Sequence, residues 1–110
     1  MNRIPLVPDG APALGVRTLL DLAPKDGAAL RAGSVTLAPG QRVPAEGWST
    51  HAADELSLIV AGALTGVSGE APFEVGGGDV TLIPAGEAHW AVAGPEGAEI
   101  FWVWFGAVDG

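Results

Sequence analysis

The stretch that decides the fold is Gly78-Asp79-Val80-Thr81-Leu82-Ile83-Pro84-Ala85-Gly86-Glu87-Ala88-His89. A short apolar run is followed by a turn in which Pro84 presets φ and Gly86 can take a positive φ. A tight corner of this kind fixes the position and direction of the first residues of the next strand. We therefore expect His89 to be held in place against a neighbouring strand.

Short runs rich in β-branched and aromatic residues, separated by Gly and Pro, recur along most of the chain. Many short strands with turn signals between them are typical of an all-β sandwich or barrel. One short segment, Gly27–Arg31, is a helix candidate, and we interpret Gly76-Gly77-Gly78 as a hairpin connection. The strands that we expect are Val16–Leu22, Ser34–Ala38, Asp54–Val60, Ala63–Val67, Phe73–Val75, Asp79–Ile83, His89–Ala93 and Glu99–Phe105.

The composition is that of a compact domain with many turns. The 110 residues include 17 Gly and 9 Pro, yet 48% of the chain is apolar and 16% is charged. Disordered chains have the opposite balance, because they are poor in apolar residues and rich in charge. We expect residues 1–14 to form an extended arm and residues 15–110 to form a single barrel domain.

The charge and the residue counts exclude several classes of function. The formal net charge is −8 with no cluster of Lys or Arg, which argues against a nucleic-acid partner. With no Cys, the chain has no disulfide, thiolate zinc site or iron–sulfur cluster. The apolar run Ile100–Val108 is far shorter than a membrane span, and prolines interrupt the N-terminus before a signal peptide could form. We expect a soluble cytoplasmic protein with no membrane partner.

Three residues before and at the start of the expected strand Asp54–Val60 share one face. Side chains alternate along an extended chain, so Ser49, His51 and Glu55 point toward the same interior. A carboxylate in a buried strand is costly unless it is paired, hydrogen-bonded or bound to a metal. Ser57 faces the same way, and we interpret it as an inward-facing or hydrogen-bonding residue rather than a nucleophile.

These residues resemble the two motifs of the cupins, small β-barrels of jelly-roll topology. The second cupin motif is Gly, five residues, Pro-x-Gly, two residues, His, three residues, Asn. The stretch from Gly78 to His89 fits each fixed position, and Ala93 stands where the motif has Asn. The resemblance covers about residues 33–105.

The second half of the first cupin motif also matches, as His51, three residues, Glu55, six residues and Gly62. The resemblance implies a divalent metal, Fe, Mn, Zn or Ni, bound in the barrel by His51, Glu55 and His89. Two His and one carboxylate suit such metals and leave coordination positions open. The first His of the motif falls on Ser49, so one family ligand is missing.

Two alternatives at this site stay open. Glu46, in the loop before Ser49, could supply an oxygen ligand, although we weigh against it. The pocket could also bind no metal, in which case Glu55 would be a structural carboxylate hydrogen-bonded to Ser49 or His51.

The resemblance implies metal-assisted chemistry on a small organic molecule, and dioxygenase, isomerase and lyase reactions all occur among cupins. The alternative is a non-catalytic binding or sensory module with a vestigial metal site, its ligand held by Trp48, Trp90 and apolar walls near Ala93. A dimeric structural domain is a third interpretation. No Lys or Arg follows Arg42, so neutral, zwitterionic or aromatic small molecules fit the motif strands better than strong anions.

The last expected strand is apolar on both faces. Phe101, Val103 and Phe105 point one way, whereas Ile100, Trp102 and Trp104 point the other. One face would fill the barrel and the other would pack under the N-terminal arm. Alternatively, Trp102 and Trp104 would meet a second subunit, or one ring would line the pocket. Because cupins commonly dimerise, we expect a homodimer.

Overall fold

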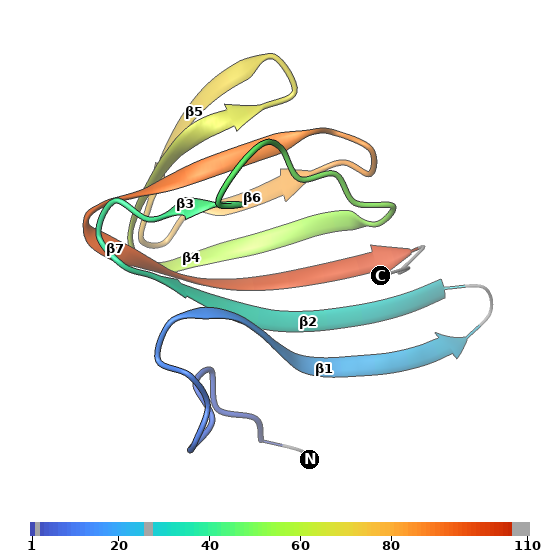
Figure 1. Cartoon of the computed structure of the whole chain (residues 1–110). Helices are drawn as coiled ribbons and strands as arrows, with labels where there is room; N and C mark the ends of the chain where they lie inside the picture. Colours follow the sequence, from blue (N-terminus) through green and yellow to red (C-terminus); the bar gives the residue numbers. More distant parts are fainter. Residues whose placement is uncertain (2, 26–27, 107–110) are drawn as a thin grey trace.

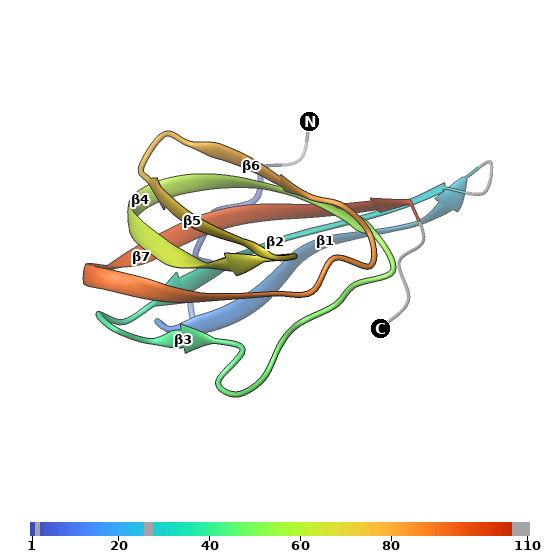
Figure 2. The same cartoon turned by 90° about the horizontal axis from the view of Figure 1, so that it is seen from above.

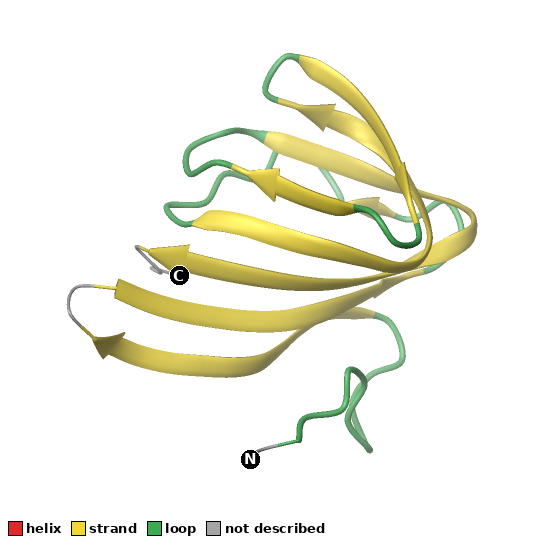
Figure 3. Ribbon diagram, turned by 180° about the vertical axis from the view of Figure 1, so that it is seen from behind, coloured by secondary structure: helices red, strands yellow, loops and turns green. Residues whose placement is uncertain are grey.

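The computed structural model describes residues 1, 3–25 and 28–106, and these residues form antiparallel β-strands and loops without a helix (Figure 3). The expectation of an all-β fold is confirmed. Within the described ranges no helix is therefore long and apolar enough to cross a membrane. The strands are β1 (Gly15–Lys25), β2 (Ala28–Leu37), β3 (Arg42–Val43), β4 (Asp54–Ser68), β5 (Ala71–Gly76), β6 (Val80–Ile83) and β7 (His89–Gly106).

The strand order is β1-β2-β7-β4-β5, with β3 paired to β7 and β6 paired to β4 (Figure 1). The two long central strands, β4 and β7, pair twice. Residues 54–62 of β4 pair with residues 98–105 of β7, and residues 64–68 pair with residues 89–93. In the first region β6 pairs with β4, and β2 pairs with β7 and with β1 beyond it. In the second region β5 pairs with β4 and β3 pairs with β7. The sheet thus curls over on itself (Figure 2) and encloses an interior between its two parts.

Glycines make the bends in the two central strands. Gly62 has a φ of 80°, and a Cβ there would lie 2.1 Å from the carbonyl oxygen of Gly97. Gly97 has a φ of 77°, and its Cβ would lie 2.5 Å from the carbonyl oxygen of Leu37. The expected strands Asp54–Val60 and Ala63–Val67 are separated around Gly62, and His89–Ala93 and Glu99–Phe105 are separated around Gly97. β4 and β7 instead continue through these points, because glycine tolerates a bend that keeps the flanking residues paired.

Two local predictions are wrong. Residues 28–31 of the helix candidate Gly27–Arg31 belong to β2, and Gly27 lies outside the described residues. So short a segment cannot sustain a helix, whereas β2 satisfies its backbone by pairing with both β1 and β7. Gly76–Gly78 is not a hairpin connection, because β5 and β6 pair with different halves of β4. It is a corner, in which the Gly78 N–H donates to the Ile59 carbonyl at 2.7 Å.

The N-terminal segment covers the outer face of β1 and β2. Arg17, which is 8% exposed, donates from Nη2 to the carbonyl oxygens of Pro12 and Ala13 at 2.8 Å. The Ser34 hydroxyl donates to the Leu6 carbonyl at 2.7 Å. Ile4 and Leu6 line a small cavity with Phe101, so this part of the outer face of β7 lies under the segment. The core on the inner side is formed by Val35, Leu37, Ile59, Leu64, Ala91, Ala93, Ala98, Ile100 and Trp102.

Candidate metal centre

A cavity of about 590 Å³ lies between the two parts of the sheet. Apolar and aromatic side chains form most of its wall. The cavity-facing residues of the last strand are Ile100, Trp102 and Trp104. Both tryptophan rings line the cavity of their own chain, which agrees with the interpretation that a ring of this strand lines the pocket.

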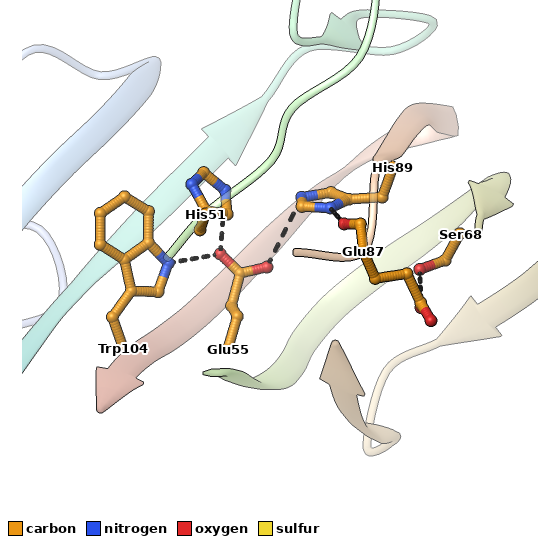
Figure 4. A network of polar contacts seen from close by, with 6 residues as sticks. All are labelled: His51, Glu55, Ser68, Glu87, His89 and Trp104. Atoms are coloured by element: carbon orange, nitrogen blue, oxygen red, sulfur yellow. Dashed lines mark hydrogen bonds and ion pairs between the residues drawn. The ribbon is translucent and has the colours of Figure 1, made fainter. Parts of the chain in front are cut away.

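Two histidines and a carboxylate meet in this wall. His51 lies in the loop before β4, Glu55 is in β4 and His89 begins β7. One ligand atom from each residue lies within 4.8 Å of the others (Figure 4). The His51 Nε2 to Glu55 Oε1 and His89 Nε2 to Glu55 Oε2 distances are both 3.9 Å. The three residues named from the sequence thus converge on one point.

Backbone hydrogen bonds hold the two segments that carry the imidazoles. The Gly86 N–H donates to the His51 carbonyl at 2.8 Å, and Ser49 and His89 exchange two backbone hydrogen bonds. The His89 Nδ1 lies 3.0 Å from the Glu87 carbonyl, which can only accept a hydrogen bond. Nδ1 is therefore the protonated nitrogen in this contact, and the Nε2 lone pair is directed to the cluster.

Trp104 positions the carboxylate. Its Nε1–H donates to Glu55 Oε1 at 2.7 Å, and its ring centroid lies 4.3 Å from that of His51 (Figure 4). Trp104 and Glu55 are cross-strand partners in β7 and β4. The sequence does not predict this contact, because the partners are 49 residues apart and only the register brings them together.

The electrostatics favour a neutral His51. Burial lowers the pKa of His51 below its ordinary value of 6.5, nearby Glu55 opposes the change, and His89 adds to the lowering. The imidazole is thus predominantly neutral at pH 7, and the neutral form is the one that binds a metal.

The spacing of the cluster fits a first-row divalent metal. Two ligands about 2.1 Å from one tetrahedral ion lie about 3.4 Å apart. The ligand atoms of the cluster lie within 4.8 Å of one another, with each imidazole 3.9 Å from a different oxygen of Glu55, so the side chains would move inward to share one ion. Two imidazoles and a carboxylate form a donor set that suits Fe, Mn, Zn or Ni.

The other residues named from the sequence separate into two groups. Ser49, Ser57 and Trp90 line the cavity. Trp48, which is 52% exposed, lies outside the cavity wall with its ring edge-on to Trp90. Ala93 is buried in the core rather than in the wall, and Glu46 is exposed and outside the cluster.

Two charged residues of the wall were not found from the sequence. Glu87 accepts a 2.6 Å hydrogen bond from Ser68, and Arg31 reaches the cavity from β2 (Figure 4 shows the Glu87 contact). Arg31 lies in β2, outside the strands that carry the two motifs. Its position opposite Trp104 depends on the pairing of β2 with β7.

A family model, described as a cupin domain, matches residues 33–104. The chain belongs to the cupin domain family. This match confirms the resemblance that the two motifs carry, and it spans the three clustered residues. No curated protein sequence matches the chain.

Solved cupin structures share the fold. A Cupin 2 conserved barrel domain protein from Salinispora arenicola is 26% identical, with a TM-score of 0.62 over 81% of this chain and 72% of that one. A Rhizobium leguminosarum protein of unknown function is 20% identical, with a TM-score of 0.64 over 90% and 88%. The DMSP lyase DddQ from Ruegeria pomeroyi is 22% identical, with a TM-score of 0.61 over 78% of this cupin and 42% of the lyase. The last two likenesses establish the barrel fold alone.

Proposed function

We propose that this cupin binds a divalent metal through His51, Glu55 and His89 and acts on a small organic molecule in the cavity. The observation that carries the proposal is the convergence of three donor atoms within 4.8 Å in a largely apolar wall. A carboxylate is costly in such a wall unless a partner compensates it. Glu55 has one hydrogen-bond donor, Trp104, and a divalent ion between the imidazoles would neutralise it.

When bound, the metal would supply Lewis acidity or a binding position for O₂. The chain itself orients the ligands, through the Glu87 carbonyl at His89 and the indole of Trp104 at Glu55. The apolar wall excludes water from a bound molecule, and Ser49 and Ser57 offer it hydroxyl groups. Dioxygenase, isomerase and lyase reactions are all consistent with this set, and the residues do not select among them.

The test is elemental analysis of protein from cells grown with added Fe, Mn, Zn and Ni. We expect close to one ion per wild-type chain and a trace in the His51→Ala, His89→Ala double variant. Glu55→Gln and Asp54→Asn form a matched pair, because the Asp54 carboxylate accepts from the exposed Ala85 N–H outside the cluster. Glu55→Gln should lose the metal and Asp54→Asn should retain it.

Equal trace metal in the wild type and the double variant would refute the proposal. The cavity would then favour the alternative from the sequence, a non-catalytic barrel that binds a small molecule without a metal. Such a ligand would raise the Tm of the wild-type protein, because it binds only the folded state.

We also propose that the protein forms a homodimer. Support comes from neighbouring apolar side chains of β4 and β6 that are 39–65% exposed and do not line the cavity, namely Leu56, Leu58, Val60 and Val80. Multi-angle light scattering should give twice the chain mass for the wild type, and Leu58→Lys should shift it toward the monomer. A monomeric wild type at high concentration would contradict this proposal.

A further inference from the structure

One cation lies in the cavity wall of the described chain. Arg31 projects inward from β2 and is the one Lys or Arg side chain among the described residues that line the cavity. Its cross-strand partner in β7 is Trp104, and its Cζ lies 5.9 Å from the centroid of the Trp104 ring. The same indole donates to Glu55, so Arg31 stands next to the proposed metal site.

The guanidinium keeps donors that the protein does not use. Arg31 Nη2 lies 3.2 Å from Asp21 Oδ2, and the Asp21 side chain is 55% exposed. An ion pair as open to solvent as this holds its partners weakly. Arg31 Nε is buried and has no hydrogen-bond partner among the described residues. An atom this buried is out of reach of a ligand, but the Arg31 side chain as a whole is 23% exposed, so its Nη groups are the donors that an acceptor from outside the chain can meet.

Arg31 and the metal ligands are close enough for one small molecule to contact both. The Trp104 centroid lies 5.9 Å from Arg31 Cζ and 4.3 Å from the His51 centroid, which places the two groups within about 10 Å. The Trp102 ring, 5.2 Å from the Trp104 ring, extends the aromatic surface beside them. A ligand that spans the two groups would therefore lie on aromatic faces.

The charge of the cavity favours an anion once a divalent ion is bound. The charged side chains of its wall are Arg31, Glu55 and Glu87, besides the two imidazoles, which are neutral when they bind a metal. The ion and Arg31 outweigh the two carboxylates of the wall by one positive charge, and Asp21 beside Arg31 offsets this only weakly because its carboxylate is open to solvent. Glu87 is moreover engaged by the Ser68 hydroxyl at 2.6 Å.

We propose that Arg31 binds the carboxylate of a small organic acid whose apolar body lies against Trp102 and Trp104 and whose far end faces the metal ligands. A carboxylate presents two oxygens in one plane, which matches the planar fork of guanidinium donors. The orientation of the far end rests on the proposed function, whereas the contact with Arg31 does not need the metal. The expectation that neutral, zwitterionic or aromatic molecules fit better concerned the motif strands, and Arg31 lies outside them in β2.

The test measures how strongly the protein prefers a carboxylate to its neutral amide. The probes are 3-phenylpropanoate, benzoate and hexanoate, each paired with its own amide. Each is titrated calorimetrically into metal-free protein, prepared with a chelator, and into protein loaded with Mn²⁺. The variants are Arg31→Gln and Arg31→Lys, with Arg42→Gln as the control, because Arg42 lies over the Trp90 ring and does not line the cavity.

We expect at least one carboxylate to bind the wild type about tenfold more tightly than its amide, the size of one charge-assisted hydrogen bond. Arg31→Gln should bring that ratio close to one in metal-free protein, Arg31→Lys should restore part of it, and Arg42→Gln should leave it unchanged. Circular dichroism and the Tm show whether each variant is folded.

Three results would overturn the proposal: no preference for any carboxylate in the wild type, an unchanged ratio in folded Arg31→Gln, or a ratio that depends on Mn²⁺ alone. The last assigns the anion to the metal. A chain that retains none of Fe, Mn, Zn and Ni in the elemental analysis but keeps an Arg31-dependent ratio would refute the proposed metal function and support this one, so the two failures are distinguishable.

Discussion

Replacing Trp104 with Phe tests whether the indole positions the metal-binding carboxylate. The substitution keeps an aromatic ring beside His51 and Trp102 but removes the Nε1–H that donates to Glu55 Oε1 at 2.7 Å. We expect the Kd for a divalent metal to rise while the fold is kept.

The magnitude follows from the strength of that bond. A hydrogen bond to a charged group contributes about 1.5–3 kcal/mol. Trp104 donates to Glu55 both before and after a metal binds, so the affinity for the metal does not fall by the full free energy of this hydrogen bond. The affinity falls because the carboxylate is no longer oriented. Removing a residue that orients a ligand typically weakens metal binding about 10- to 100-fold. We therefore expect a rise in Kd of about tenfold, the lower end of that range.

The assay is a titration of metal-free protein with Zn²⁺ against a competing chelator. The matched control is Trp102→Phe, the same change two residues away in β7 on a ring that packs against Trp104. The control should bind Zn²⁺ with nearly the wild-type Kd. The reasoning is refuted if Trp104→Phe also keeps the wild-type Kd, or if the two variants lose affinity equally, because packing would then explain the loss.

The remaining predictions concern stability. Gly62→Ala should lower the free energy of unfolding by about 1–3 kcal/mol more than Gly78→Ala. Both glycines have a positive φ, but only the Cβ added at Gly62 would clash with backbone, at Gly97. Equal urea midpoints for the two variants would contradict this. Because burial lowers the pKa of His51, its contribution to the stability of metal-free protein is complete above pH 6.5 and is lost as the pH falls through its folded-state pKa. The loss of stability between pH 7.5 and pH 5 should therefore be smaller in His51→Gln, and identical profiles would argue against it. Arg17→Met should speed amide hydrogen exchange in residues 3–14, since it removes the hydrogen bonds from Arg17 to the Pro12 and Ala13 carbonyls. Unchanged exchange would show that the other contacts of this segment suffice.

The parts of the site that depend on local sequence were predictable. The Pro84–Gly86 turn directs His89. His51 and Glu55 meet as expected, but His51 lies in the loop before β4, so alternation along a strand does not by itself place it. Trp104 and Arg31 could not be placed in the same way. Their positions depend on the register of β7 against β4 and β2, and such long-range pairings leave no local pattern in the sequence.

The same limit explains the errors in the fold. A glycine at the end of a strand and a glycine at a bend within one look alike in sequence, so β4 and β7 were each divided in two. Gly62 is a bend because the carbonyl oxygen of Gly97 lies against it, and that contact exists only after the sheet has curled. The start of β2 was missed for a related reason, since its residues are held as a strand by partners on both sides.

The most direct test of the metal centre is a crystal of this cupin soaked in turn with Zn²⁺ and Mn²⁺, measured at the absorption edge of Zn and, for Mn, at a longer wavelength where its anomalous signal is strong. Our account predicts an anomalous peak in the cavity, about 2.0–2.2 Å from the Nε2 atoms of His51 and His89 and from a carboxylate oxygen of Glu55. A cavity without a peak after both soaks, or a peak bound by other residues, would contradict it.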